Sequence, residues 1–415
     1  MKTLDLRYGK KKISLKLEEG NVLSVLSGKK LSPLTNLEEK IKRVLTYPIS
    51  SKSLREIFDP GDKTAIIVSD RTRNIAASVF LPVIVNELNS TGIPDKDIFI
   101  VFSLGTHRLH SKKEHAAIVG EEIAGRVRLL DHDCNDKDNL TSLGVTSRGT
   151  KVEVNKEVAE ADKVILTGAI TYHYFAGYGG GRKAVLPGVS AFDTIQTNHK
   201  LCLTSDKAKT GVLEGNPVHE DMLEAAKMLG PDMIFNVVMD DSGRISSIFA
   251  GELQAAHEAG CEALDNSFKV SVEKKAKFII ASAGGGTKDL NFVQTHKAME
   301  NASYALEDGG TMILLGESGE GFPSGEYMKY VNLGSAKAIE DELRRSFTIP
   351  GHTILSARKK AEKFRIILLS KLDRNAVQKL GIIPVDNLAE AMNLAGINEP
   401  AYIMPDAYNT LPATG

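Results

Sequence analysis

The sequence lacks several features that would assign it to a special class of protein. It has no tryptophan and only three cysteines, Cys134, Cys202 and Cys261, among 415 residues. The cysteines show no CxxC spacing, which argues against a disulfide framework or structural zinc and favours the reducing cytoplasm. No apolar run approaches the length of a membrane span, and residues 1–15 have no apolar core of signal-peptide length. We therefore expect a cytoplasmic protein with no membrane partner.

An excess of charge is also missing. The net charge is −1, and 52 basic residues are mixed with 53 acidic ones along the chain. Nucleic-acid-binding domains usually cluster basic residues, so we expect no nucleic-acid partner. Hydrophobic content of 42% and charged content of 25% are ordinary for a soluble globular protein. The length is sufficient for two domains of normal size.

The order of hydrophobic patterns predicts an α/β fold. Apolar runs at residues 63–69, 97–103, 127–130 and 163–168 indicate buried strands, with helix-like patterns between them. Strands that alternate with helices imply a mostly parallel sheet covered on both faces. A further strand at 277–282 opens a smaller α/β pattern. We predict two α/β domains with mostly parallel sheets, residues 1–270 and residues 271–415.

The two ends of the chain have patterns of their own. Residues 2–30 alternate short apolar and polar stretches, which predicts a small β-meander. The tail after Pro400 is expected to be extended and to fold back onto the body.

Polar clusters follow three of the predicted strands. Asp70 to Arg73 follow the first strand, Gly105 to Arg108 the second, and Thr171 to His173 the strand at 163–168. The carboxyl ends of parallel strands lie at one edge of a sheet, and ligands bind there in open α/β sheets. We therefore expect these three clusters to form a site.

The stretch from Thr171 to His199 predicts an active-site loop, because aromatic residues and histidines interleave with its glycines. It does not match a P-loop, since Arg182 replaces the second glycine and Ala184 the Ser or Thr. Its glycines could still hold a phosphate through backbone N–H groups. Lys183, set among glycines and apolar residues, is a candidate for covalent attachment of a substrate or cofactor.

Three of the ten histidines lie on the predicted site edge: His107, His173 and His199. Two histidines can serve as a matched acid and base, and the third could bind a metal. Three histidines on one zinc ion remain an alternative, without an HxH or HExxH cluster to support it. The other histidines are expected to be structural or solvent-facing, and His296 to lie on a helix surface.

Two cations are candidates for anion binding. Arg73 offers a planar fork that suits a carboxylate, and Lys297 a mobile point charge. Gln294 lies three residues before Lys297, so the two share one face of a predicted helix.

Six motifs occur in this order along nearly the whole chain, and together they are similar to those of the lactate racemase family. They are Asp70-Arg71-Thr72-Arg73, Gly105-Thr106-His107-Arg108, Tyr172-His173, Gly179-Gly180-Gly181-Arg182-Lys183, Asn198-His199 and Gln294-Thr295-His296-Lys297. The members of that family are nickel-pincer-nucleotide 2-hydroxyacid racemases. The resemblance implies two α/β domains with the active site in the cleft between them.

The resemblance also implies a role for each residue. Lys183 would carry the cofactor, a pyridinium-3-thioamide-5-thiocarboxylic acid mononucleotide, and His199 would be the protein ligand of its nickel. His107 and His173 would be the acid and base of a hydride-transfer mechanism. Arg73 and Lys297 would bind the substrate carboxylate, with Gln294 as a hydrogen-bond partner. Four further residues would face the cofactor phosphate or ribose: Asp70, Thr72, Gly105 and Thr106. Separate cofactor-building enzymes would be maturation partners.

One departure bears on the substrate. The lactate enzyme of this family has a tryptophan near the methyl side of its substrate, and this sequence has none. We take residues 349–355 as the equivalent region and expect a pocket for lactate or a bulkier 2-hydroxyacid. Two alternatives stay open: a dehydrogenase or lyase with a loose nicotinamide cofactor, and a non-catalytic protein that binds organic acids.

Overall fold

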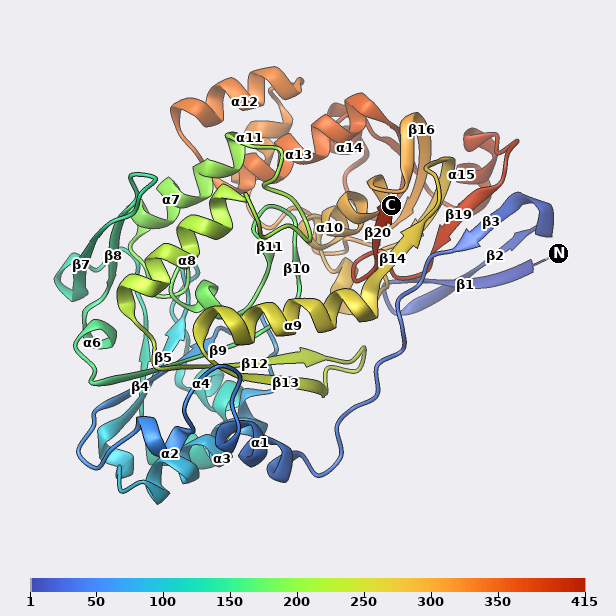
Figure 1. Ribbon diagram of the computed structural model, residues 1–415. Coiled ribbons are helices and arrows are strands. Elements are labelled where there is room, and N and C mark those ends of the chain that lie inside the picture. Colours follow the sequence, from blue (N-terminus) through green and yellow to red (C-terminus); the bar gives the residue numbers. More distant parts are fainter. Residues whose placement is uncertain (1, 415) are drawn as a thin grey trace. The chain divides into compact units, whose positions relative to one another are not determined.

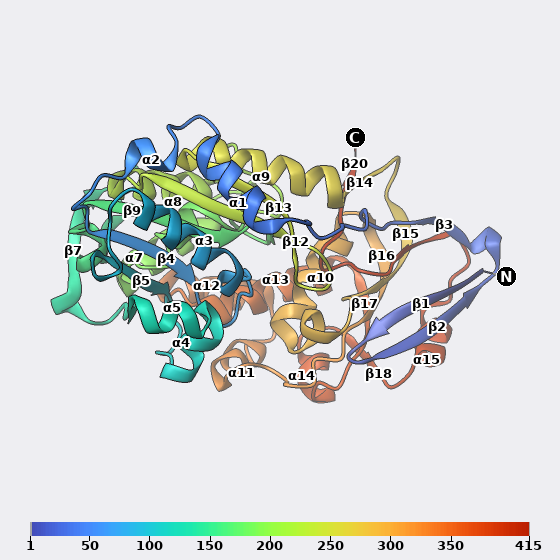
Figure 2. The ribbon, with the colours of Figure 1, turned by 90° about the horizontal axis from the view of Figure 1, so that it is seen from below.

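The computed structural model describes residues 2–414, which form two compact units. The central unit comprises residues 30–266, and the terminal unit comprises residues 2–29 together with 267–414. Each unit is an α/β structure built around one six-stranded sheet (Figures 1 and 2). The predicted fold class, α/β with mostly parallel sheets, is confirmed.

The central unit has a sheet with the strand order β13-β12-β9-β4-β5-β6. Its strands are β4 (Thr64–Ser69), β5 (Ile98–Ser103), β6 (Arg128–Asp131), β9 (Lys163–Ala169), β12 (Met233–Met239) and β13 (Ile245–Gly251). All neighbours are parallel except β12 and β13. The apolar runs in the sequence predicted β4, β5, β6 and β9 to within a residue or two, because central strands buried on both faces have few polar side chains.

Side chains of the central sheet alternate between two cores. In β4, Ile66 and Val68 belong to one core and Ala65 and Ile67 to the other, since successive strand residues point to opposite faces. The first core is closed by α1 (Leu37–Thr46), α2 (Leu54–Ile57), α3 (Ala77–Ser90), α4 (Lys112–Val119) and α5 (Glu121–Arg126). The second is closed by α6 (Lys156–Ala159), α7 (Phe192–Lys200), α8 (Pro217–Leu229) and α9 (Leu253–Phe268). Figure 1 shows α1–α3 on one side of the sheet and α8 and α9 on the other.

A hairpin that the sequence analysis did not predict extends the second core. It consists of β7 (Leu140–Val145) and β8 (Lys151–Asn155), which pair in antiparallel fashion. Its strands are short and partly exposed, so they lack the apolar run that marks a central strand.

The terminal unit has a wholly parallel sheet with the order β18-β17-β16-β15-β19-β3. Its strands are β3 (Val22–Val25), β15 (Ala276–Ser282), β16 (Leu306–Leu315), β17 (Arg365–Leu369), β18 (Ile383–Val385) and β19 (Ala401–Met404). The helices are α10 (Phe292–Ser303), α11 (Gly325–Val331), α12 (Ala336–Arg345), α13 (Ile349–Lys363), α14 (Arg374–Lys379) and α15 (Leu388–Ala395). The hairpin β1 (Lys2–Tyr8) and β2 (Lys11–Leu17) shares one hydrophobic core with α15.

The first 29 residues differ from the predicted domain division. The sequence places them in a domain of residues 1–270, whereas the structure places them with the C-terminal segment. Leu6, Leu15 and Leu17 of the hairpin are buried in the core of the terminal sheet, and β3 pairs with β19. The predicted meander is therefore a two-stranded hairpin, and β3, which follows it, joins the terminal sheet instead. The tail is extended as expected, with β20 (Leu411–Thr414) beside β14 (Lys269–Val272).

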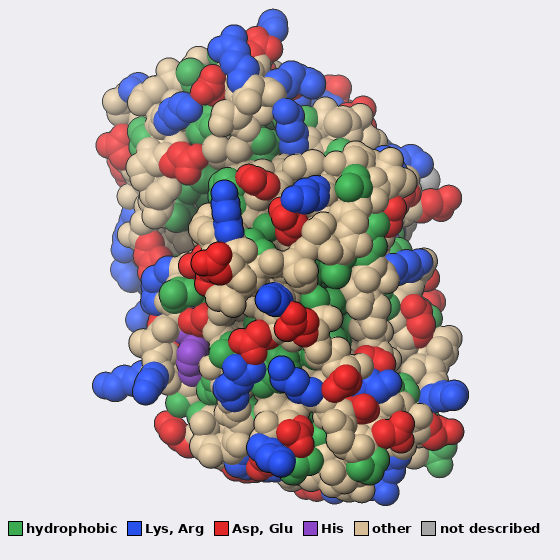
Figure 3. Space-filling model, turned by 90° about the vertical axis from the view of Figure 1, so that its left-hand side faces the viewer, with side chains coloured by type: hydrophobic (Ala, Val, Ile, Leu, Met, Phe, Trp, Pro, Cys, Tyr) green, Lys and Arg blue, Asp and Glu red, His purple; other side chains and the backbone are tan. Residues whose placement is uncertain are grey.

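Two surface features complete the description. Within residues 2–414, no helix combines the length and the apolar character needed to cross a lipid bilayer. On the face drawn in Figure 3, basic and acidic side chains of the described residues are interspersed, without a large patch of one sign.

Candidate active site

Three loops meet at the carboxyl edge of the central sheet. Strand β4 lies between β9 and β5 and is parallel to both, so the ends of all three point the same way. Ser69, the last residue of β4, pairs with Ser103, the last residue of β5. The polar clusters predicted from the sequence therefore start from neighbouring strand ends. Their expected convergence on one sheet edge is confirmed.

Asp70 and His107 form a tight pair at this edge. The Asp70 side chain is 1% exposed, and its Oδ2 lies 2.6 Å from His107 Nδ1. Its Oδ1 accepts from Thr72 Oγ1 at 2.8 Å and lies 3.5 Å from Arg73 Nη1. Burial raises the pKa of Asp70, but the hydrogen bond from His107 and the charge of Arg73 outweigh burial, and the net pKa is lowered. Asp70 is thus an anion at neutral pH.

The Asp70 carboxylate fixes the tautomer of His107. An anionic carboxylate accepts hydrogen bonds only, so His107 must carry its proton on Nδ1. The lone pair then lies on Nε2, and the His107 side chain is 45% exposed. His107 therefore has the form of a general base oriented by a buried acid, the arrangement used by many hydrolytic and transfer enzymes.

A glycine turn presents His107. Gly105 has φ = 54°, its N–H donates to Gly188 O at 2.9 Å, and the His107 N–H donates to Leu104 O at 2.9 Å. Thr106 and His107 are exposed at the tip of this turn. The hydrogen bond to Gly188 joins the turn to the segment just after Lys183, which ends the Gly-rich loop, residues 174–183.

Three of the predicted site residues lie close to the ring of Phe175. Its ring centroid lies 4.5 Å from that of His173 and 5.1 Å from that of His199. Lys183 Nζ lies 5.7 Å from the same ring centroid. Phe175 is itself buried. A single buried ring therefore sets the positions of a histidine, a lysine and a second histidine from three segments of the chain.

His173 has the opposite tautomer to His107. It ends β10 (Tyr172–His173), which pairs with β11 (Gly177–Tyr178), and the Ala176 N–H donates to its Nδ1 at 3.3 Å. Because Nδ1 accepts, the proton of neutral His173 lies on Nε2. The site therefore holds one imidazole with a lone pair on Nε2 and one with a proton on Nε2.

His199 lies in α7 and is only 3% exposed. The neighbouring Asn198 donates from its amide nitrogen to Val218 O at 3.1 Å and to Asp221 Oδ2 at 2.8 Å. Its amide oxygen therefore faces His199 Nδ1, at 3.2 Å, and accepts the proton there. The lone pair of His199 is left on Nε2, the form in which imidazole binds a metal.

Buried Arg182 holds the Gly-rich loop together. It is fully buried and donates from Nη2 to the carbonyl oxygens of Ala176 and Tyr178, at 2.9 and 3.0 Å. Its Nη1 lies 2.8 Å from His257 Nε2. Burial lowers the pKa of Arg182 to about 10 and that of His257 well below its ordinary value, so a neutral His257 faces a cationic Arg182. Arg182 supports the loop rather than facing a ligand.

The glycines of the loop do not form the expected phosphate cradle. The Gly179 N–H donates to Thr171 O at 2.7 Å, and the Gly181 N–H donates to Asn236 Oδ1 at 3.0 Å. Gly177 has φ = 77°, and a Cβ there would lie 2.1 Å from Val212 O. These glycines serve close packing of the loop on its own chain.

Two predicted substrate-binding residues lie in the terminal unit, on α10. Lys297 Nζ lies 3.0 Å from Gln294 Oε1 and 3.0 Å from the hydroxyl of Tyr408. The shared helix face of Gln294 and Lys297 is confirmed. Tyr408, in the C-terminal tail, was missed because a tyrosine in an irregular segment has no pattern in the sequence.

His296 on the same helix was wrongly placed on its surface. It is 0% exposed, and its Nε2 lies 3.3 Å from Glu300 Oε1 in the core of the unit. The helix is buried on two sides, so its period alone does not identify an exposed face.

The region taken from the sequence as the equivalent of the tryptophan-bearing one, residues 349–355, forms the first turns of α13. Residues 351–355 are buried, and a Cβ on Gly351 would lie 2.6 Å from Tyr330 Cζ. The predicted roomier pocket remains a prediction.

The structure also gives roles to residues that the sequence did not single out. Phe175 was visible only as one aromatic residue of the stretch from Thr171 to His199, and Asn198 only as part of a motif, since their contacts depend on segments distant in the chain. The burial of Arg182 had no signal in the sequence, where this residue served to exclude a P-loop.

The chain is similar to known proteins over most of its length. The family model described as the lactate racemase N-terminal domain matches residues 8–211, and that described as the lactate racemase C-terminal domain matches residues 271–402. The lactate racemase of Thermoanaerobacterium thermosaccharolyticum is 34% identical over 330 residues, covering 78% of this chain and 77% of that protein. The lactate racemase of Lactiplantibacillus plantarum is 32% identical over 358 residues, covering 84% and 82%.

Solved structures agree with these matches. The lactate racemase apoprotein from Thermoanaerobacterium thermosaccharolyticum superposes with a TM-score of 0.92 at 29% identity, covering 99% of this chain and 100% of that one. A protein from Thermotoga maritima has a TM-score of 0.69 at 16% identity, covering 93% and 100%, which supports the fold alone.

Proposed function

This chain belongs to the lactate racemase family, and on that premise we propose that it interconverts the stereoisomers of a 2-hydroxyacid. The observation that carries the proposal is the pair of opposite histidine tautomers at one sheet edge. His107 presents a lone pair on Nε2 and His173 presents a proton on Nε2. Racemisation needs a base for one stereoisomer and an acid for the other.

The reaction at Cα determines the acid and base roles of these two histidines. Removing the Cα proton of a 2-hydroxyacid is difficult, because that proton is weakly acidic. Removing the Cα hydrogen as hydride is easier when a base takes the hydroxyl proton, and it leaves a planar 2-oxoacid. His107 would take this proton from one stereoisomer, and His173 would give a proton to the carbonyl oxygen of the 2-oxoacid, which becomes the hydroxyl of the other stereoisomer when hydride returns to Cα. Each histidine reverses its role in the opposite direction.

The residues present fit a covalently bound nickel cofactor. Lys183 is partly buried beside Phe175, where its amine can be attached to a carboxyl-derived arm. Buried His199 has its lone pair on Nε2, as a nickel ligand requires. We propose that these two residues hold a nickel-pincer nucleotide, which when bound would accept the hydride from Cα and return it.

We propose that cationic side chains bind the substrate carboxylate. Arg73 lies at the same strand end as Asp70, and we propose that it binds the substrate carboxylate. Lys297 and Gln294 of the terminal unit are retained as proposed carboxylate-binding residues. Thr72, Gly105 and Thr106 are retained as proposed cofactor contacts. Asp70 fits that role poorly, because an anion repels a phosphate. We propose instead that Asp70 orients His107.

The experiment uses full-length protein produced together with cofactor-building enzymes. Intact mass should rise by a mononucleotide-sized adduct that is lost in Lys183→Ala, and bound nickel should be lost in His199→Ala. Chiral chromatography of a series of 2-hydroxyacids then measures racemisation. His107→Asn and His173→Asn should each lower kcat by a factor of about 10² to 10⁴. Arg108→Gln, on the same turn, is the control and should leave kcat unchanged.

Unmodified, nickel-free protein that converts no 2-hydroxyacid would argue against the proposal. A requirement for added nicotinamide nucleotide would favour a dehydrogenase. Binding of organic acids that is indifferent to loss of His107 and His173 would favour a binding protein.

A further inference from the structure

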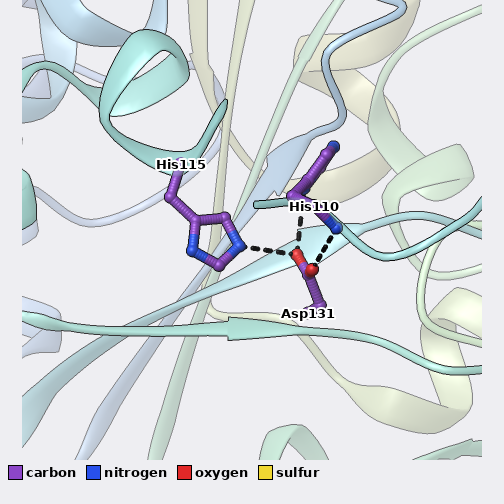
Figure 4. A group of neighbouring side chains, drawn as sticks. All are labelled: His110, His115 and Asp131. Atoms are coloured by element: carbon purple, nitrogen blue, oxygen red, sulfur yellow. Dashed lines mark hydrogen bonds and ion pairs between the residues drawn. The ribbon is translucent and has the colours of Figure 1, made fainter. Parts of the chain in front are cut away.

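We propose that His110, His115 and Asp131 form a binding site for one divalent transition-metal ion of the zinc class. His110 follows the turn that carries His107, His115 lies in α4, and Asp131 ends β6 (Figure 4). Their potential ligand atoms all lie within 4.8 Å of one another. Both histidines are among those that the sequence predicts to be structural or solvent-facing, and the aspartate that joins them is distant along the chain.

The two imidazole nitrogens lie close to one oxygen of the carboxylate. His110 Nδ1 and His115 Nε2 each lie 2.9 Å from the same oxygen, Asp131 Oδ1. Figure 4 shows both rings directed at this carboxylate from two sides. Two imidazole nitrogens and one carboxylate oxygen are ligands that zinc takes in tetrahedral sites, with a water molecule as the fourth. Calcium and magnesium prefer oxygen ligands throughout, so they fit this set poorly.

The neighbouring groups hold the donors in place. The His110 N–H donates to Asp131 Oδ2 at 2.5 Å, which fixes the carboxylate. The Phe102 ring stacks on His115, with centroids 4.6 Å apart and planes 7° apart, and it meets His110 edge-on at 5.2 Å. Supporting contacts of this kind orient the ligands of metal sites before the ion binds.

The site is accessible without being fully exposed. The side chains of His115 and Asp131 are 16% and 11% exposed, and that of His110 is 1% exposed. In the metal-free protein the ring N–H groups donate to Asp131, and a metal ion replaces these protons.

Metal binding would change one contact near the candidate active site. The Arg71 N–H lies 3.4 Å from His110 Nε2, which accepts it weakly. Ligation through Nδ1 puts the proton on Nε2 and breaks this contact. Arg71 lies between Asp70 and Thr72, so occupancy of the metal site alters the segment beside the Asp70–His107 pair. The inference is separate from the proposed reaction, because none of the three ligands is assigned to it.

The test is zinc binding by the tag-free, full-length protein. Chelator-treated wild type and variants are dialysed against buffered zinc, and bound zinc is measured by mass spectrometry of the metal. We expect wild type to bind one equivalent more than His115→Gln or Asp131→Asn. Affinity at this site should fall at least about 100-fold in each variant, since loss of supporting residues alone costs 10- to 100-fold. Asp133→Asn makes the same chemical change at an exposed position nearby and should bind like wild type.

Near-ultraviolet circular dichroism identifies variants that do not fold. If Asp131→Asn fails to fold, His115→Gln carries the test, because it removes a ring at a partly exposed helix position. Equal zinc binding by wild type and folded variants, or no zinc bound by wild type, would overturn the proposal. The three side chains would then be a hydrogen-bonded clamp only.

Discussion

Single residues at the carboxyl edge of the central sheet decide the chemistry open to this protein. Asp70 is buried beside His107, and its lowered pKa keeps it anionic, which assigns the Nδ1 proton of His107. His173 accepts at Nδ1 instead. The two histidine tautomers depend on backbone and side-chain contacts with other segments. They therefore cannot be predicted from the positions of the histidines in the sequence.

Asp70→Asn should lower kcat of the cofactor-loaded protein by a factor of about 10² to 10⁴, because a neutral amide stabilises the charged form of His107 poorly. Steady-state kinetics measure the effect. Asp133→Asn is the matched control and should change kcat little, since Asp133 is exposed. Equal activity of Asp70→Asn and wild type would refute the orienting role of Asp70.

The same substitution predicts a pH dependence of stability. The pKa of Asp70 lies below its ordinary value of 3.8 in the folded protein, so its ionisation stabilises the fold above that value. This contribution is lost as the pH falls through the folded pKa. Asp70→Asn should therefore be less stable than wild type by about 1–3 kcal/mol at pH 7. Urea unfolding should show the difference shrinking below about pH 4; a constant difference would contradict this account.

At the scale of elements, two buried side chains stabilise the Gly-rich loop. Arg182 donates hydrogen bonds to two carbonyl groups of the loop, and the ring of Phe175 packs against His173, Lys183 and His199. The sequence predicted that this loop bears a site, since histidines and a lysine interleave with glycine. It did not predict how the loop is held, because burial of an arginine cannot be inferred from its residue type.

Arg182→Met should destabilise the loop. Methionine fills much of the same volume but leaves the Tyr178 carbonyl group buried without a donor, and the Ala176 carbonyl group keeps only the Tyr178 N–H, at a cost of about 1–3 kcal/mol. Hydrogen exchange should become faster at residues 174–181. Arg148→Met, at a surface ion pair with Glu220, is the control and should cost less than about 1 kcal/mol. Unchanged exchange in the loop would rule out the anchoring role.

Two glycines allow the cost of a positive φ to be distinguished from the cost of a steric clash at an added Cβ. Gly177 and Gly149 both have positive φ, 77° and 85°, but only Gly177 has a backbone oxygen at 2.1 Å from an added Cβ. Gly149→Ala should cost about 1 kcal/mol, the strain alone, and Gly177→Ala about 3 kcal/mol or more. Chemical denaturation measures both. Similar losses would mean that close packing at Gly177 is unimportant.

At the scale of the whole molecule, the chain's two ends share one unit. Strands inside each sheet were predicted because apolar runs mark them, and the three polar clusters were predicted because such strands end at a common edge. The pairing of β3 with β19 was not predicted, since it joins the beginning of the chain to its end through backbone contacts. Such long-range pairing has no local signal in the sequence.

Acid stability of the protein should depend on a buried carboxylate in the terminal unit. Burial raises the pKa of Glu300, but Lys360 at 2.8 Å and His296 outweigh burial and lower it to about 2. Because the pKa of Glu300 is lower in the folded protein than in the unfolded chain, its ionised carboxylate stabilises the fold at pH values above the unfolded pKa. This stabilisation is lost as the pH falls toward 2. Glu300→Gln should therefore lower stability at pH 7 by about 3 kcal/mol, and less at pH 3. Glu342→Gln, on surface helix α12, is the control; an equal loss in both variants would contradict this account.

The central claim is that this chain racemises a 2-hydroxyacid by moving hydride to and from Cα. The most direct test gives the cofactor-loaded protein a single enantiomer deuterated at Cα, in ordinary water. A hydride that stays with the protein during the reaction does not exchange with solvent. We predict that both enantiomers appear and that both retain deuterium at Cα. Racemisation with loss of deuterium would contradict hydride transfer, and no racemisation of any 2-hydroxyacid would contradict the proposed function itself.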